Sequence, residues 1–517
     1  MINGCYLFRY VFNILKIQQK NLFYDIISML KKLGYFIFTE RGYCYTNVFG
    51  YAIDYGILIM NIYFVGIGGV SMSGLAEIAL ANGHNVFGSD LQMSNSIKRL
   101  VEKGAIVYSN HDKANITNEL DLVVYTAAVK EDNPEYMEAL SKGIKLQNRA
   151  QFLGDLMKSY KNAISIAGTH GKTTTTSMVS SIFKYGNYDP TILVGGNLNI
   201  INGNVNVGKT DYFITEACEY TNSFLNFNSK VAIVLNIEAD HLDYFSGLDE
   251  IKESFNKFGK LLPKEGFFIV NGDDVNTKDI DKGVLATVIR FGKGSHNDAI
   301  FNVISYDEKG CARYTLSYKG VDLGEFKISV PGEHNAYNSV SAILSAYVLG
   351  LDIEDIRENI ALYTGVGRRF EFKGTFGENI KVIDDYAHHP TEIKATLKAA
   401  QNMKNGKVWA IFQPHTYSRT ITLLDEFANA FHDADNVIIP DIYASREKFT
   451  TEVSSKDLCD RIQCSFDKSS SNLDKTVNYI PELKDVVDYI QSNAKENDLV
   501  LTIGAGDVYK VAEELVK

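Results

Sequence analysis

The chain has 517 residues, which suits about three domains at roughly 100 to 200 residues each. Hydrophobic residues make up 45% and charged residues 22%, with only 8 prolines, and this composition excludes a disordered, collagen-like or low-complexity chain. The net charge of −11 argues against nucleic acid or an acidic lipid surface as a partner. Six cysteines without a CxxC pair favour a reducing cytoplasm over a disulfide framework or a structural zinc site.

Residues 1–59 differ in character from the rest of the chain. They carry 14 of its 60 aromatic residues, and six basic against three acidic residues. No uncharged apolar run reaches the ~18 residues that a bilayer span needs, so we expect neither a stable membrane anchor nor a signal peptide. At Met60 an apolar strand pattern begins. We therefore expect a wrongly assigned start upstream of Met60 or an accessory extension, with a membrane-touching aromatic segment as the alternative.

From Met60 onward, short β-branched or aromatic runs alternate with helical patterns, which is typical of α/β proteins with parallel βαβ units. We expect three domains, over residues 60–160, 161–365 and 366–517. The patterns predict helices over 72–82, 172–185 and 335–349, and strands over 61–66, 85–89, 120–126, 163–167, 211–216, 231–236, 267–271, 380–384, 408–412, 437–439 and 499–503.

A glycine-rich turn follows the first expected strand, and Asp90 lies 22 residues after its second glycine. The spacing is close to a nicotinamide-cofactor fingerprint, but Ser71 replaces the third glycine. Such a turn can hold a pyrophosphate at a helix N-terminus, and a UDP group suits it as well as NAD. The candidate binding residues are Gly66, Gly68, Gly69, Ser71, Met72, Ser73, Gly74 and Asp90.

The strongest motif is GTHGKTT at residues 168–174, where an expected strand passes into a helix. Glycines let backbone N–H groups close around an anion, Lys172 can reach the β- and γ-phosphates, and the Thr173 hydroxyl can ligate Mg²⁺. Ile166 occupies a position where the full Walker A pattern has glycine. We therefore expect a shortened phosphate-binding loop.

Acidic and imidazole side chains follow two further strands of the expected central domain. Glu216 and Glu219 end one strand, and Asp240 and His241 follow the other. Together with Thr173, such groups are suited to hold Mg²⁺ against a triphosphate. The alternative for His241 is a packed or solvated side chain.

Two stretches near the last predicted domain boundary also suit a nucleotide. Asn335 begins a predicted helix, where helix capping is the alternative to nucleotide contact. Arg368 and Arg369 lie at the boundary itself. An arginine there can reach a phosphate when domains close, and surface salt bridging is the alternative.

In the third domain, polar residues follow two strands. Asp385, Tyr386 and His388 lie in the stretch DDYAHHP, and Arg419 follows the next strand. Open α/β sheets bind ligands at the carboxyl ends of their strands, and an arginine can bind a carboxylate through two N–H groups. We therefore expect a second small-molecule site here.

In this order, the stretches GIGGVSMSG, GTHGKTTTT, NIEADH, GEHNAYN, GVGRRFE, DDYAHHPTE and FQPHTYSR resemble the Mur ligase family over residues 60–517. The resemblance implies an N-terminal Rossmann-like domain for a UDP-sugar, a central P-loop ATPase-type domain with a mixed sheet, and a C-terminal Rossmann-like domain for an amino acid. The implied activity is ATP-dependent ligation of L-alanine to the lactoyl carboxylate of UDP-N-acetylmuramate through an acyl phosphate, with Mg²⁺, in cytoplasmic peptidoglycan precursor synthesis.

The resemblance also implies roles for individual residues. ATP would contact Gly168, Thr169, His170, Gly171, Lys172, Thr173, Thr174, Asn335, Arg368 and Arg369, and the UDP-sugar would contact Asp90 and the seven residues of the first turn named above. Catalysis would involve Lys172, Glu216, His241 and His388, and Mg²⁺ would be held by Thr173, Glu216 and His241. The amino acid would contact Asp385, Tyr386, His388 and Arg419. Thr416 departs from the many relatives that have arginine there, which leaves Arg419 as the expected cationic partner of the alanine carboxylate.

Three other functions compete with this one. A recycling ligase that joins a tripeptide to the same UDP-sugar would need a roomier acceptor pocket. A nicotinamide-dependent oxidoreductase rests on the first glycine turn alone, and a nucleotide-binding regulator would bind ATP without turnover. Neither of the last two explains the polar strand ends of the third domain.

Overall fold

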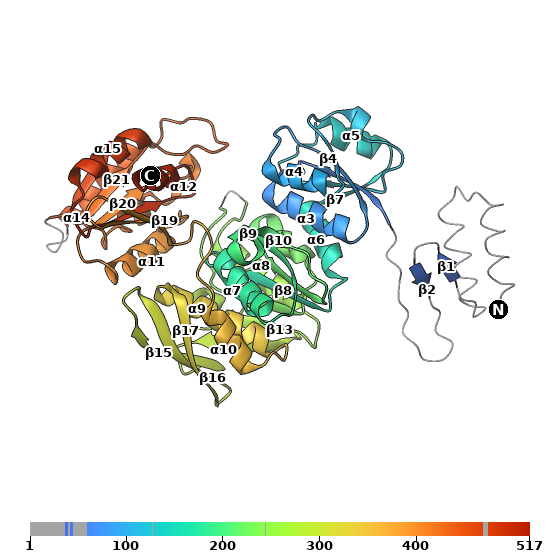
Figure 1. Ribbon diagram of the computed structural model, residues 1–517, viewed down its shortest axis with the longest axis horizontal. Coiled ribbons are helices and arrows are strands. Elements are labelled where there is room, and N and C mark those ends of the chain that lie inside the picture. Colours follow the sequence, from blue (N-terminus) through green and yellow to red (C-terminus); the bar gives the residue numbers. More distant parts are fainter. Residues whose placement is uncertain (1–36, 40–41, 45–58, 127, 243, 469–473) are drawn as a thin grey trace.

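The computed structural model describes residues 37–39, 42–44, 59–126, 128–242, 244–468 and 474–517. Three lobes, each built around its own sheet, follow one another along the chain (Figure 1). The predicted α/β class with three sheets is confirmed, whereas the expectations for residues 1–59 lie almost entirely outside the described residues. Two short strands there, β1 (Ile37–Thr39) and β2 (Gly42–Cys44), pair antiparallel. No helix of the described part is long and apolar enough to cross a membrane.

The N-terminal sheet is fully parallel, in the order β5-β4-β3-β6-β7. Its central strand β3 (Asn61–Val65) sends Ile62 and Phe64 into one core and Tyr63 and Val65 into another, as the two-residue period of a strand requires. The other elements are β4 (Asn85–Ser89), β5 (Ile106–Tyr108), β6 (Leu122–Tyr125), β7 (Lys145–Asn148), α3 (Val70–Ala81), α4 (Asn95–Glu102), α5 (Pro134–Ser141) and α6 (Arg149–Met157).

The central sheet is mixed, in the order β10-β9-β11-β8-β12-β13-β14-β15-β16-β17. Strands β9, β11, β8, β12, β13 and β14 run parallel, and the antiparallel meander β15-β16-β17 extends one edge. Helices α7 and α9 pack together against this sheet (Figure 1). The elements are β8 (Asn162–Ala167), α7 (Lys172–Tyr185), β9 (Thr191–Leu198), β10 (Gly203–Asn206), β11 (Tyr212–Glu216), β12 (Val231–Val234), α8 (Leu248–Lys260), β13 (Phe267–Asn271), β14 (Thr287–Gly292), β15 (Ala299–Tyr306), β16 (Cys311–Tyr318), β17 (Val321–Pro331), α9 (Glu333–Tyr347) and α10 (Ile353–Ala361).

The C-terminal sheet has the order β18-β19-β23-β20-β21-β22, and only the pair β18-β19 is antiparallel. Its parallel strands end at one edge, which carries the residues expected to bind an amino acid. The elements are β18 (Glu371–Phe376), β19 (Ile380–Asp385), α11 (Pro390–Gln401), β20 (Val408–Phe412), α12 (Tyr417–Thr422), α13 (Leu424–Ala428), β21 (Asn436–Ile439), α14 (Ser455–Asp467), β22 (Thr476–Tyr479), α15 (Leu483–Asn493), β23 (Leu499–Ile503) and α16 (Tyr509–Leu515).

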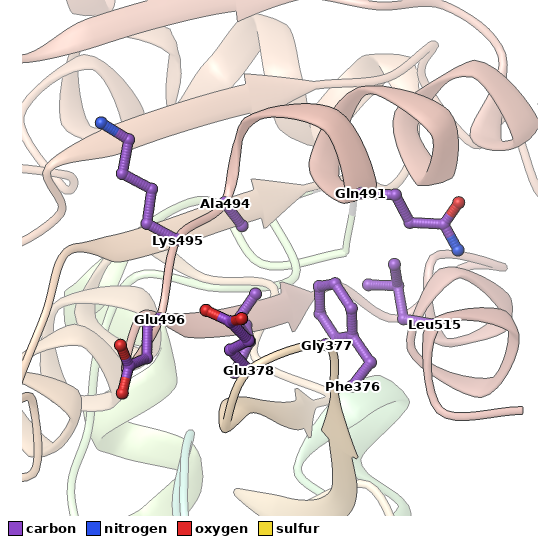
Figure 2. Close-up of a pocket in the computed structure, with 9 residues that line it drawn as sticks. Phe376, Gly377, Glu378, Gln491, Ala494, Lys495, Glu496 and Leu515 are labelled. Carbon is purple, nitrogen blue, oxygen red and sulfur yellow. The ribbon is translucent and has the colours of Figure 1, made fainter.

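A pocket in this domain lies between the β18–β19 turn and the ends of α15 and α16 (Figure 2). Phe376, Glu378, Lys495 and Leu515 contribute to its lining. It lies at the amino ends of β19 and β23, so it is at the opposite edge of the sheet from the expected ligand site. The residues expected to bind ligands lie instead at the carboxyl ends of the strands.

Candidate active site

The phosphate-binding loop connects the buried strand β8 to helix α7. Gly168 and Gly171 have φ values of +138° and +85°, a region that glycine adopts without steric cost. Asn236 fixes the loop from the neighbouring strand end, because its side chain accepts from the His170 N–H at 2.7 Å and donates to the His170 carbonyl at 3.1 Å. The loop is thus held in shape by the protein itself.

Lys172 lies at the mouth of this loop. Its Nζ donates to the carbonyl oxygens of Gly168 and Thr169 and lies 3.1 Å from both carboxylate oxygens of buried Glu219. Burial disfavours the ammonium, but the Glu219 carboxylate outweighs it and raises the pKa of Lys172. Lys172 therefore stays charged, and an incoming phosphate would compete with Glu219 for it.

The predicted metal ligands lie beside the same helix start. Glu216 accepts a hydrogen bond from the Gly195 N–H at 2.6 Å, and a Cβ on Gly196 would lie 3.1 Å from the Thr173 methyl. His241 Nε2 is 3.9 Å from Glu219 Oε1. Carboxylates and a hydroxyl with one imidazole are residue types that suit the oxygen preference of Mg²⁺. Metal binding by Thr173, Glu216 and His241 stays a prediction.

Asn335 lies at the start of α9 and is buried. Its side-chain amide donates to the Pro331 carbonyl at 2.7 Å and accepts from Asn338 at 3.1 Å. A Cβ on Gly171 would lie 2.8 Å from Asn338 Oδ1. The start of α9 therefore backs onto the phosphate-binding loop, and direct nucleotide contact by Asn335 stays a prediction.

The first glycine turn is shaped by Asp90, which the sequence predicted as a ligand-binding residue. Asp90 Oδ2 accepts from the Gly68 N–H at 2.9 Å, and a Cβ on Gly68 would lie 2.8 Å from the same oxygen. Gly66 has a φ of +78°. At the far side of the turn, the Ser71 hydroxyl accepts from Arg149 at 3.2 Å, so a half-buried arginine that the sequence did not suggest lies beside the turn.

Three of the residues predicted to bind the UDP-sugar pack against protein. Met72 is buried in the apolar core, and the Ser73 hydroxyl donates to the Val70 carbonyl at 3.1 Å. A Cβ on Gly74 would lie 2.5 Å from Leu193 of the central domain. Packing thus accounts for these three positions, and ligand contact there stays a prediction.

The two arginines at the domain boundary have different surroundings. Arg368 donates to Asp384 at 3.0 Å and to the Gly504 carbonyl at 2.7 Å, so it is bound within the C-terminal domain. Arg369 Nη1 instead lies 3.8 Å from Glu392 Oε1, the carboxylate oxygen that also faces His170 of the central domain. Nucleotide contact by either arginine stays a prediction.

A group of side chains joins the central and C-terminal domains beside the phosphate-binding loop; we call it the interdomain cluster. His170 and Glu238 come from the central domain, and His389, Thr391 and Glu392 come from the C-terminal domain. His170 lies 3.2 Å from Glu392 through Nδ1 and 3.4 Å from Glu238 through Nε2. Glu238 Oε2 also accepts from the Thr391 hydroxyl at 2.7 Å, and it lies 3.4 Å from His389 Nδ1.

The cluster is electrostatically balanced. Burial disfavours the His170 imidazolium, but Glu392 and Glu238 outweigh this and raise its pKa to about 9. Burial also disfavours the Glu392 carboxylate, but His388 and His170 hold its pKa well below the ordinary range. The ligand atoms of His170, Glu238 and His389 lie within 4.8 Å of one another. Because Glu392 and Thr391 already engage two of these residues, we regard the group as an ionic contact between domains.

The predicted amino-acid residues lie at the strand ends on the C-terminal side of this cluster. The Asp385 carboxylate is buried and accepts from the Ala387 N–H at 3.0 Å and the Thr396 hydroxyl at 2.8 Å, so it shapes the turn. The Tyr386 and His388 rings lie 5.5 Å apart. Arg419 crosses to the central domain and lies 3.5 Å from Asp240.

Reasoning from the sequence missed Glu238, Glu392 and Arg149 as functional residues. Glu392 carried a local signal, because His389-Pro390-Thr391-Glu392 has the spacing of a capping box, with proline at the first helical position. The partners of Glu238 and Arg149 come from distant parts of the chain, and no local pattern indicates them.

Comparisons with known proteins agree with this arrangement. The chain matches the family models of the Mur ligase catalytic domain over residues 61–161, the Mur ligase middle domain over 166–346 and the Mur ligase glutamate ligase domain over 368–506. It is 49% identical over 457 residues to a UDP-N-acetylmuramate–L-alanine ligase of Caldanaerobacter subterraneus, covering 88% of this chain and 97% of the relative. It is 51% identical over 453 residues to the enzyme of the same name from Clostridium botulinum strain Langeland, covering 88% and 96%.

Solved structures show the same architecture. A UDP-N-acetylmuramate–alanine ligase from Thermotoga maritima superposes with a TM-score of 0.71 at 28% identity, covering 88% of this chain and 98% of the other. A murein peptide ligase from Psychrobacter arcticus gives a TM-score of 0.62 at 27% identity, with the same coverage. With three family models in order and relatives near half identity over most of its length, the chain belongs to the Mur ligase family.

Proposed function

We propose that this chain ligates L-alanine to the lactoyl carboxylate of UDP-N-acetylmuramate at the expense of ATP. The names of its relatives at 49% and 51% identity support this substrate pair. The structural observation that carries the proposal is the contact between the phosphate-binding loop and the polar strand ends of the C-terminal domain, where His170 lies 3.2 Å from Glu392. That contact supports the proposal because it joins the loop expected to bind phosphate to the strand ends expected to bind the amino acid.

In the first step, a carboxylate oxygen of the sugar nucleotide attacks the γ-phosphorus of ATP, and ADP leaves. The product is an acyl phosphate, which makes the carbonyl carbon electrophilic. Lys172 neutralises charge on the transferred group, in exchange for its contact with Glu219. Thr173, Glu216 and His241 would hold Mg²⁺, which supplies further charge neutralisation when bound.

In the second step, the alanine amine attacks the acyl carbon, and the tetrahedral intermediate collapses to the amide with loss of phosphate. Arg419 is suited to bind the alanine carboxylate, since its side chain is mostly buried at the edge of the strand ends. Burial lowers the pKa of His388, so its ring is neutral near pH 7 and can accept the proton that the amine loses.

The N-terminal domain would bind the UDP-sugar. The turn over Gly66, Gly68 and Gly69 offers backbone N–H groups at the start of α3, and Asp90 fixes it. Arg149 beside Ser71 adds a half-buried cation near the turn. We further propose cytoplasmic action, because the substrates of this reaction are soluble nucleotides and an amino acid.

Phosphate release tests the proposal and its alternative together. With UDP-N-acetylmuramate, ATP and Mg²⁺ present, L-alanine should stimulate release strongly, and the tripeptide of the recycling reaction should not. Stronger stimulation by the tripeptide would favour the recycling ligase, and no stimulation by either amine would exclude both.

A further inference from the structure

Glu392 belongs to none of the predicted substrate sites, yet it contacts two of them. Its Oε2 accepts from the backbone N–H groups of His388 at 2.9 Å and His389 at 3.2 Å. Its Oε1 lies 3.2 Å from His170 Nδ1 in the phosphate-binding loop. A single carboxylate thus connects the loop that holds the nucleotide with the turn that carries His388.

The contact depends on both domains. The Glu392 side chain is 14% exposed and the His170 side chain 13%, so separation of the domains would break a mostly buried ion pair. Removing one member of a buried ion pair leaves an uncompensated charge in a poorly solvated place. Within the C-terminal domain, His388 Nδ1 at 3.4 Å and Arg369 Nη1 at 3.8 Å also lie beside the carboxylate. The pair therefore favours the arrangement in which the C-terminal domain is docked on the loop.

The same pair also explains the use of histidine within the phosphate-binding loop. The backbone of His170 is held by Asn236, which leaves its side chain free to serve a different purpose. That side chain lies between Glu238 of its own domain and Glu392 of the other. Without a cation between them, these two carboxylates would repel each other across the interface.

We propose that His170 and Glu392 form a positioning pair, through which a side chain of the phosphate-binding loop sets the location of His388 and thereby controls the use of the amino acid. The inference rests on the proposed function, because it assigns alanine to the C-terminal strand ends. It predicts that a substitution in the loop impairs alanine use while leaving ATP binding nearly intact.

The test compares His170→Asn, Glu392→Gln and the double variant. Gln at position 392 keeps an acceptor oxygen and remains a capping-box residue, so α11 should still fold. Arg461→Met is the matched control, because it removes an ion pair with Asp425 at the surface of the same domain. The measurements are the Kd of ATP without alanine, the KM for L-alanine, kcat, and the thermal unfolding midpoint.

Each single substitution should raise the KM for alanine about tenfold and change the Kd of ATP less than twofold, and the double variant should be no worse than either single one. Arg461→Met should leave all four quantities unchanged. The proposal would be contradicted if the effects of the two substitutions multiplied in the double variant. It would also be contradicted if the affinity for ATP fell while the KM for alanine stayed normal. Absence of alanine-dependent turnover in the wild type would instead refute the proposed function. In that case the pair can still be tested by the distance between labels placed on the two domains, which should be longer in both single variants than in the wild type.

Discussion

The central domain meets its two neighbours through interfaces of opposite chemistry. Toward the N-terminal domain the interface is mainly apolar: one hydrophobic core runs from Phe64 and Phe152 to Leu193 and Phe224 of the central domain. Toward the C-terminal domain it includes the interdomain cluster and the Asp240–Arg419 pair. The two apolar cores of the C-terminal domain contain only residues from 370 onward.

This difference indicates which domain moves during the reaction. Apolar burial is non-directional and grows with area, so the first interface should hold the N-terminal domain in one place. Ionic contacts are directional and exchange readily with water and salt, so the second can form and break in each cycle. A ligase must exclude water from its acyl phosphate and then release product, which requires such reversible docking.

The largest expected effect comes from a substitution in the phosphate-binding loop of the central domain. Lys172→Ala removes the ammonium that, in the proposed function, neutralises the transferred phosphoryl group, and we expect a loss of ligation of about 10³-fold or more. The variant should still unfold cooperatively, as followed by circular dichroism. Near-native phosphate release by this variant would contradict the assignment of the loop.

The next effect concerns the polar interface. Arg419→Lys keeps a positive charge but loses the planar donor fork, and we expect the KM for alanine to rise by about ten- to a hundredfold. The KM for ATP should change little. An unchanged KM for alanine would show that Arg419 does not bind the alanine carboxylate.

A substitution in the apolar interface should change the stability of the protein and leave its kinetic constants unchanged. A Cβ on Gly154 of α6 would lie 1.9 Å from the Asn226 carbonyl oxygen, so Gly154→Ala should lower the free energy of unfolding by roughly 1–3 kcal/mol. Ser141→Ala at an exposed position of α5 is the control and should change it by less than about 0.5 kcal/mol. If Gly154→Ala raised the KM for alanine without lowering the free energy of unfolding, the apolar interface would not have the purely structural role that distinguishes it from the polar one.

The smallest effect is a pH dependence of the interdomain cluster. The pKa of His170 is raised to about 9, so its contribution to stability is complete below its ordinary value of 6.5 and is lost as pH rises through about 9. The pKa of Glu392 is lowered, so its contribution is present above 4.5 and is lost as pH falls through its lower folded value. Near pH 7 the wild type should melt about 2–4 °C above His170→Asn. A gap that persists above pH 10 would contradict the ionic nature of the contact.

The sequence predicted those features that depend on local patterns. Helix α7 over 172–185 and strands such as β4 and β20 occur where predicted, because hydrophobic period and glycine placement determine them. The strands β15, β16 and β17 were missed, although β17 alternates buried and exposed residues along much of its length.

The site was predictable only in part. The loop around Lys172 follows from its motif, and the structure contains it. The spacing indicated Asp90 as a ligand-binding residue, whereas in the structure its carboxylate accepts a hydrogen bond from the Gly68 N–H. The pairing of Lys172 with Glu219, and of His170 with Glu392, joins residues that are distant in the chain. Such contacts depend on how sheets and domains dock, which no single segment encodes.

The most direct test of the central claim is product identification. Purified enzyme is incubated with UDP-N-acetylmuramate, ATP, Mg²⁺ and isotopically labelled L-alanine, and the nucleotide fraction is analysed by mass spectrometry. We predict a labelled UDP-N-acetylmuramoyl-alanine that forms in equal amount to ADP and is absent with Lys172→Ala. ATP consumption without label in the nucleotide would contradict the claim that the C-terminal domain delivers alanine to the activated carboxylate.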